Sequence, residues 1–151
     1  MPNGIIIVDH GSRREESNKM LEHVAALFAE RFSEKYEIVE PAHMELAEPS
    51  IATAYARCVE RGAERIVVLP FFLGPGKHWT QDIPRLTADA AVQFPATRFH
   101  VAPTLGIDDL ILDLLAKRAG FCEHKGYSCE LCRGTLRCGE LEAVAAPIVQ
   151  S

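Results

Sequence analysis

Apolar residues in this chain gather in four short runs, and the first run consists entirely of β-branched residues. The runs cover residues 5–8, 36–44, 65–73 and 98–103, and the first and third are almost entirely apolar. An uninterrupted apolar run of this length is typical of a strand that is buried on both faces of a sheet. Pro41 interrupts the second run, so we predict a weaker strand there.

Stretches with helical spacing follow these runs. Apolar residues recur every three or four positions over residues 15–32, 51–59, 82–94 and 108–118, which predicts amphipathic helices. Pro49 suits the first turn of the second helix. Alternation of strand and helix implies a parallel sheet with helices on its faces. We therefore predict an α/β fold, in which one parallel-sheet domain carries helices on both faces.

The apolar stripes of these helices predict which side chains face the sheet. Those of the first and last helices are Met20, Leu21, Val24, Leu27 and Phe28, and Leu110, Ile111, Leu114 and Leu115. Asp108 is predicted to cap the last helix. Cys58 lies on the stripe of the second helix, so we interpret it as part of the core.

The composition of the chain changes after Gly120. The segment FCEHKGYSCELCRGTLRCGE has few apolar residues and no clear period, so burial alone cannot order it. Four of the five cysteines lie here: Cys122, Cys129, Cys132 and Cys138. We therefore expect an α/β domain over residues 1–119 and an irregular Cys-rich extension with a tail over residues 120–151.

Length and charge argue against several classes of protein. The chain has 151 residues, which suits a single core, and its net charge of −5 argues against a nucleic-acid partner. No apolar run approaches the ~20 residues that span a bilayer, and the first residues lack the basic region of a signal peptide.

The cysteines favour a metal or cluster site, because disulfide frameworks are typical of small secreted chains and this chain shows no secretory signal. Zinc and an iron–sulfur cluster both suit four thiolates, and a redox sensor is a third interpretation.

Polar residues follow three of the predicted strands. His10 ends the first strand, and Glu45 follows the second. Lys77 and His78 follow the third. Ligands of an open α/β sheet bind beyond the carboxyl ends of its strands, so we expect these side chains to converge. Imidazole and carboxylate suit a first-row divalent metal, but they leave a hydrolytic metal site, a phosphate site and a metal carrier open. His43 lies on the same strand face as Glu45, and we interpret it as a structural histidine.

Three motifs in the chain resemble those of a known family. VDHGSRREESN at Val8–Asn18, EPAHMELAEPSI at Glu40–Ile51 and LPFFLGPGKHWTQDIP at Leu69–Pro84 are together similar to the sirohydrochlorin ferrochelatases of the class II chelatase family. The resemblance runs to about Leu115. The cysteine spacing C-x-x-C-x5-C resembles the plant and algal branch, whose members carry an iron–sulfur cluster there.

This resemblance implies that the chain inserts ferrous iron into sirohydrochlorin to form siroheme. It implies active-site and metal-binding roles for His10, His78 and Glu45, which suit metal binding and proton transfer. Cobalt insertion, as in cobalamin synthesis, is an alternative, and a non-catalytic carrier of metal or tetrapyrrole is another. Basic residues on or after the same loops are expected to pair with the substrate's carboxylates or merely to solvate the loops; they are Arg13, Arg14, Lys77 and Arg85.

The resemblance also bears on cofactor, assembly and location. It implies one iron–sulfur cluster, [2Fe–2S] in preference to [4Fe–4S], whose ligands are Cys122, Cys129, Cys132 and Cys138. Because the chain is half the size of the internally duplicated members of the family, the resemblance implies a homodimer. A plant or algal chain of this kind would work in the plastid stroma after loss of a transit peptide, and any other in the cytoplasm.

Overall fold

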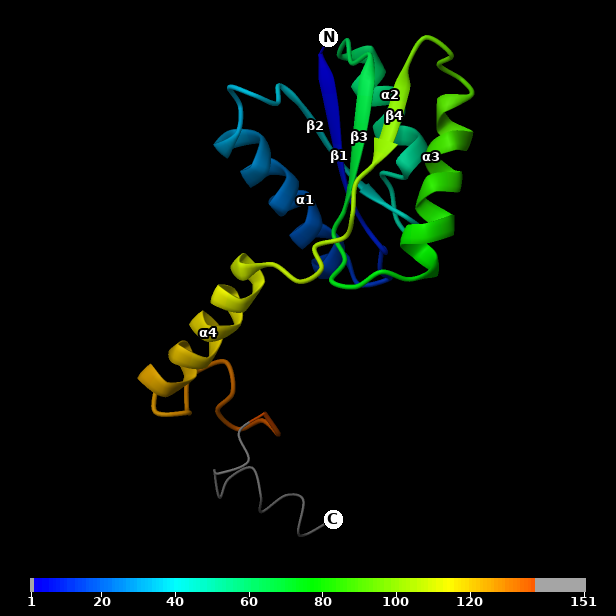
Figure 1. Ribbon diagram of the computed structural model, residues 1–151. Helices are drawn as coiled ribbons and strands as arrows, with labels where there is room; N and C mark the ends of the chain where they lie inside the picture. The colour runs from blue at the N-terminus through cyan, green and yellow to red at the C-terminus, as the bar shows by residue number, and fades with distance from the viewer. Residues whose placement is uncertain (1, 138–151) are drawn as a thin grey trace. The chain divides into compact units, whose positions relative to one another are not determined.

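The computed structural model describes residues 2–137, which form alternating strands and helices (Figure 1). In chain order the elements are β1 (Asn3–Asp9), α1 (Glu15–Arg31), β2 (Ile38–His43), α2 (Ile51–Glu60), β3 (Arg65–Pro70), the π-helical turn η1 (His78–Asp82), α3 (Ile83–Ala91), β4 (Arg98–Val101) and α4 (Asp109–His124). These described residues group into two compact units, divided between residues 106 and 107. No helix among the described residues is long and apolar enough to cross a membrane.

The first unit is a parallel sheet with helices on both faces, as predicted. Its strands lie in the order β2-β1-β3-β4, and every neighbouring pair is parallel. Ile5 and Ile7 of β1 pack with Leu21 of α1, whereas Ile6 and Val8 pack on the opposite face with residues of α2 and α3. This alternation follows from the two-residue period of a strand, and Figure 1 shows α1 apart from α2 and α3.

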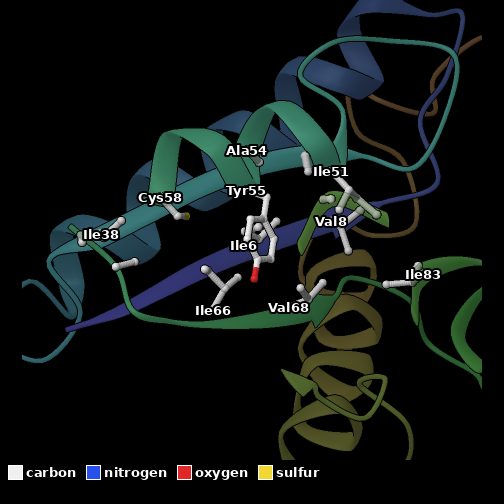
Figure 2. Packing of buried hydrophobic residues seen from close by; sticks show 13 residues of the cluster. Ile6, Val8, Ile38, Ile51, Ala54, Tyr55, Cys58, Ile66, Val68 and Ile83 are labelled. Atoms are coloured by element: carbon white, nitrogen blue, oxygen red, sulfur yellow. The ribbon is translucent and has the colours of Figure 1, made fainter. Parts of the chain in front are cut away.

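The larger core lies between the sheet and the helices α2 and α3. Tyr55 and Cys58 of α2 are fully buried there with Ile6 of β1 and Ile66 of β3 (Figure 2). Burying one such aliphatic side chain stabilises the fold by about 1.5–3 kcal/mol relative to leaving it exposed. The Tyr55 hydroxyl, the one polar group of its ring, lies 2.7 Å from the hydroxyl of Thr97. The prediction that Cys58 belongs to the core is confirmed.

The stripe of α1 is narrower than the sequence suggests. Leu21 and Ala25 are buried and Phe28 packs beside them, which is the i, i+4, i+7 spacing of one helix face. The predicted Met20 and Leu27 are instead 58% and 52% exposed. They lie one residue before Leu21 and Phe28, about a quarter turn around the helix, where the sheet does not reach.

The starts of α2 and α3 also differ from the prediction. Pro49 lies outside α2, because Ser50 is the N-cap and its hydroxyl accepts a hydrogen bond from the Thr53 N–H at 3.1 Å. The third helix begins at Ile83, after η1, and ends at Ala91. The π-helical turn therefore occupies residues 78–82, of which the sequence predicts only Asp82 to be helical.

The second unit contains α4 and a series of turns. Asp108 caps α4, as predicted, and its carboxylate accepts a hydrogen bond from the Leu110 N–H at 2.9 Å. The helix continues to His124, six residues past the predicted end at 118 and through the expected boundary at residue 119. Within its own unit α4 buries none of the apolar side chains that were expected to face inward. Cys138 and the tail after it lie outside the described residues.

Candidate functional site

The site begins where β1 and β2 end side by side. Backbone pairing continues past the strands: the Met44 N–H donates to the Asp9 carbonyl at 2.9 Å, and the Glu45 N–H donates to the His10 carbonyl at 3.2 Å. Gly11 follows with a φ of 89°, and a Cβ at this position would collide with the Glu45 carbonyl. Only glycine permits both this backbone conformation and this close approach, so Gly11 lets His10 stand next to Glu45.

The His10 ring presents one nitrogen toward a carboxylate. Its Nε2 lies 3.4 Å from Glu45 Oε1, and the two side chains are 41% and 52% exposed. Its Nδ1 donates to the Gly11 carbonyl at 3.3 Å. Because Nδ1 is occupied in this way, Nε2 is the nitrogen that is open to a metal or a proton.

His78 lies beside His10 and belongs to η1, the turn that follows β3. Its ring lies edge-on to the His10 ring, with the centroids 4.5 Å apart and the planes at 80°. Its Nδ1 donates to Asp82 Oδ2 at 3.0 Å, four residues along the same turn. The Trp79 indole N–H donates to the Ala102 carbonyl at 2.9 Å, which ties the turn to the chain just after β4.

The structure therefore brings together the three residues that the sequence places at strand ends, His10, Glu45 and His78. His10 contacts Glu45 on one side and His78 on the other. Within residues 2–137, no three His, Cys, Asp or Glu side chains are arranged so that they could hold one metal ion together. All three side chains are partly exposed, so rotation about their side-chain bonds can bring them around an incoming ion. Their roles in metal binding and catalysis stay predictions.

The four basic residues predicted to bind substrate are exposed. Arg13 and Arg14 lie between β1 and α1, and Lys77 immediately precedes His78. Arg85 on α3 lies 3.7 Å from Asp82, the carboxylate that orients His78. The accessible charge suits an anionic ligand, but contact with a substrate stays a prediction for each of the four.

Sequence reasoning missed two carboxylates that contact the site histidines or their neighbours. Asp82 orients His78, and the spacing of four residues on a helical turn was the available signal. Asp9 bonds to His43, and the signal was its place opposite that residue at the ends of two parallel strands. That pairing depends on the register of β1 against β2, which residue spacing alone does not give.

Two cysteines of the second unit form a tight turn. The Cys129 N–H donates to Cys132 Sγ at 3.3 Å, and Cys122 in α4 is exposed. Cys138 is the fourth predicted ligand and falls outside the described residues. The described part thus contains one C-x-x-C turn and a third cysteine that is not gathered with it into a metal centre.

Cys58, the remaining cysteine, has a different environment. Burial raises the pKa of its thiol to about 12, with a further rise from Glu40 and an opposing effect from Arg61. A thiol of this kind stays protonated at neutral pH and is a poor nucleophile and metal ligand. This agrees with its place in the core.

A parallel sheet that gathers two imidazoles and a carboxylate beyond its strand ends defines the class of protein, an α/β domain that presents nitrogen and oxygen ligands suited to a first-row metal. The family model CbiX matches residues 4–120 of the chain. The chain therefore belongs to the CbiX family, and the predicted family resemblance is confirmed.

Three relatives illustrate the likeness. Over 140 residues the chain is 52% identical to the chloroplastic sirohydrochlorin ferrochelatase of Arabidopsis thaliana, across 90% of this chain and 61% of that protein. It is 44% identical over 82 residues to the sirohydrochlorin cobaltochelatase of Methanocaldococcus jannaschii, across 54% and 56%. The solved structure of the sirohydrochlorin chelatase SirB from Bacillus subtilis subspecies spizizenii in complex with cobalt matches with a TM-score of 0.68 and 32% identity, across 80% and 50%. The chain thus spans less than two thirds of the length of each.

Proposed function

We propose that the chain is a chelatase that inserts Fe²⁺ into sirohydrochlorin to form siroheme. The observation that carries the proposal is the meeting of His10, Glu45 and His78 beyond the strand ends of a CbiX-family sheet. The Arabidopsis relative, at 52% identity, is named a sirohydrochlorin ferrochelatase, which favours iron as the metal.

The reaction exchanges one metal ion for two protons. Fe²⁺ enters the macrocycle, two pyrrole N–H bonds break, and two protons leave. Each site histidine uses Nδ1 for an internal hydrogen bond, so its Nε2 is available to hold the ion or to accept a proton. Glu45 lies beside His10 Nε2 and is half exposed, so its carboxylate can pass a proton to solvent or complete the ion's ligands.

Substrate binding is proposed to use the exposed basic residues around this site. Sirohydrochlorin carries eight carboxylates, and arginine pairs with carboxylates through two parallel hydrogen bonds. The proposed contacts are Arg13, Arg14, Lys77 and Arg85. Their exposure keeps them accessible to a ligand as large as a tetrapyrrole.

The test is anaerobic incubation of the protein with sirohydrochlorin and Fe²⁺, followed by absorbance, with Co²⁺ and Ni²⁺ in parallel. Siroheme formation well above the rate without protein is the expected result. Faster insertion of Co²⁺ would instead assign the activity named for the Methanocaldococcus relative. Stoichiometric binding of metal or tetrapyrrole without turnover would replace the enzyme with a carrier.

The cysteines of the second unit are proposed to hold an iron–sulfur cluster, [2Fe–2S] in preference to [4Fe–4S]. The C-x-x-C turn supports this, because the Cys129 N–H already points at Cys132 Sγ, and hydrogen bonds to sulfur stabilise cluster thiolates. Cys122 and Cys138 would complete the ligand set. When bound, the cluster would supply order to the extension and a redox-active group. The functional division is then a chelatase domain, 1–119, and a cluster-bearing extension, 120–151.

Two further proposals concern the oligomeric state of the protein and its location in the cell. Matching only 50% of the SirB chain supports a homodimer in which a second copy supplies the other half. The chloroplastic name of the Arabidopsis relative supports a plastid location. Sedimentation of the purified protein at several concentrations tests the first proposal, and localisation of the protein in source cells tests the second.

A further inference from the structure

His43 is a fully buried polar side chain at the end of β2. It is 0% exposed and lies on the face of the sheet that α1 covers. Its Nδ1 donates to Asp9 Oδ1 at 2.7 Å, between residues that are opposite in the register of β1 and β2. The same carboxylate oxygen accepts a hydrogen bond from the Gly11 N–H at 3.0 Å. One oxygen of Asp9 thus joins a buried imidazole to the loop that follows His10.

The other ring nitrogen of His43, Nε2, is buried without a hydrogen bond among the described residues. The nearest carboxylate oxygen, Glu22 Oε1, is 4.0 Å away. A buried polar atom without a partner destabilises a fold, whereas an apolar side chain would fill the same volume without that cost. The imidazole is therefore explained by its Nδ1 contact with Asp9.

We infer that Asp9 and His43 form a positioning pair for the metal-insertion site. His43 fixes the carboxylate of Asp9, the carboxylate fixes the amide of Gly11, and Gly11 sets where the His10 ring stands beside Glu45. The inference rests on the proposed chelatase function and deepens it by assigning two further residues to the same site.

The contacts of His10 explain why such a pair matters. The ring is 41% exposed, and among residues 2–137 the hydrogen-bond partner of its Nδ1 is the Gly11 carbonyl, at 3.3 Å. Gly11 is thus held on both sides, through its N–H by Asp9 and through its carbonyl by His10. A shift of the Gly11 backbone therefore moves the ring, and errors of about 1 Å in a reacting group can cost about 100-fold in rate.

The test compares three replacements of His43 in the full chain. The amide nitrogen of asparagine occupies roughly the place of Nδ1, so His43→Asn keeps a donor toward Asp9. His43→Gln carries its amide nearer the place of Nε2, and His43→Leu has no donor. We expect kcat for Fe²⁺ insertion to fall about 10- to 100-fold in His43→Leu and His43→Gln and to be largely restored in His43→Asn, with KM for sirohydrochlorin little changed.

Asp9 supplies the second arm and remains informative if a His43 variant folds poorly. Asp9→Ala removes both hydrogen bonds and is expected to lower kcat as His43→Leu does, whereas Asp9→Asn keeps an acceptor oxygen and loses less. The double variant Asp9→Ala/His43→Leu is expected to be no slower than the worse single variant, because residues acting through one path are not additive.

Thr87→Val is the matched control for loss of a buried polar contact. Thr87 is also 0% exposed, and its hydroxyl bonds within α3 to the Ile83 carbonyl at 2.7 Å. We expect Thr87→Val to lower Tm while leaving kcat of the folded protein unchanged. If the Asp9 and His43 variants behave in the same way, the pair is merely structural and the inference is wrong. Equal kcat in His43→Asn and His43→Leu would also overturn it. Absence of turnover in the wild-type protein would instead refute the proposed function.

Discussion

At the scale of single residues, the two site histidines share one arrangement with different partners. Each uses Nδ1 for an internal acceptor, which is the Gly11 carbonyl for His10 and the Asp82 carboxylate for His78. Such partners fix the tautomer and the orientation of a histidine, so the second nitrogen is left available for the proposed role of base or metal ligand. The edge-on contact of the two rings then places these two groups within one small space.

We expect replacement of either histidine with alanine to remove the proposed chemistry and to spare the fold. The side chains of His10 and His78 are 41% and 47% exposed and lie outside the core, so Tm should change little. We expect His10→Ala and His78→Ala each to lower Fe²⁺ insertion by about 100-fold or more, as for loss of a general base or metal ligand. Steady-state rates with sirohydrochlorin measure this, with His100→Ala on β4 as the control. Near wild-type rates in both single variants would remove the assignment.

Cys58 is expected to be unreactive in the native protein. Its thiol has a pKa of about 12 and is buried, whereas Cys122 is exposed. In protein freed of bound iron and sulfide, iodoacetamide at pH 8 should modify Cys122 and leave Cys58 unmodified until denaturant is added, which peptide mass analysis can show. Rapid modification of native Cys58 would contradict its burial.

The same shift predicts how stability depends on pH. The thiol of Cys58 ionises near 9 when exposed and near 12 when folded, so the unfolded chain loses this proton first. This contribution to the free energy of unfolding is fully present below pH 9 and declines as the pH rises toward 12. In a Cys58→Ala variant that part of the alkaline decline should be missing from urea titrations.

At the scale of elements, the sequence predicts the strands and helices well because each has a clear period. The runs at 5–8 and 65–73 became neighbouring central strands, and the predicted site lies beyond their ends and that of β2. The π-helical turn at 78–82 was not predicted, since Pro84 and the glycines before it obscure any period. The pairing of Asp9 with His43 was also beyond reach, because it depends on register and on burial by α1.

Replacing Gly11 tests how closely the loops after β1 and β2 must approach each other. It has a φ of 89°, and a Cβ would collide with the Glu45 carbonyl, whereas Gly62 has a φ of 98° and open space around it. Both Gly11→Ala and Gly62→Ala carry the backbone cost, of order 1–3 kcal/mol. Only Gly11→Ala must also push Glu45 away from His10, so it should lose more stability and most of its activity.

Urea unfolding and Fe²⁺ insertion assays on both variants separate these effects. The activity of Gly62→Ala, measured where it is fully folded, should match that of the wild-type protein. Equal losses of activity in the two variants would mean that the contact with Glu45 does not control the site.

At the scale of the whole molecule, the two units divide the proposed chemistry. His10, Glu45 and His78 all lie within residues 1–106, and the C-x-x-C turn lies within residues 107–151. The sequence predicts the end of α4 at residue 118, before the change of composition after Gly120, but the helix continues through that glycine, which costs only about 1 kcal/mol in a helix. The helix therefore carries Cys122, and a cluster would join the end of α4 to the turns that follow it.

Replacing one cysteine of the turn should separate cluster binding from metal insertion. Cys132→Ser removes the sulfur that accepts the Cys129 N–H, so we expect the variant to lose its iron–sulfur absorbance and its bound sulfide. Because the proposed catalytic groups lie in the other unit, the variant should keep roughly half or more of the wild-type rate of Fe²⁺ insertion.

Cys58→Ala is the control and should keep the cluster, since Cys58 is buried in the core. The measurement is iron and acid-labile sulfide in anaerobically purified protein, wild type beside both variants. Stoichiometric zinc without sulfide in the wild-type protein would replace the cluster with a structural zinc site, and complete loss of insertion in Cys132→Ser would show that the second unit takes part in catalysis.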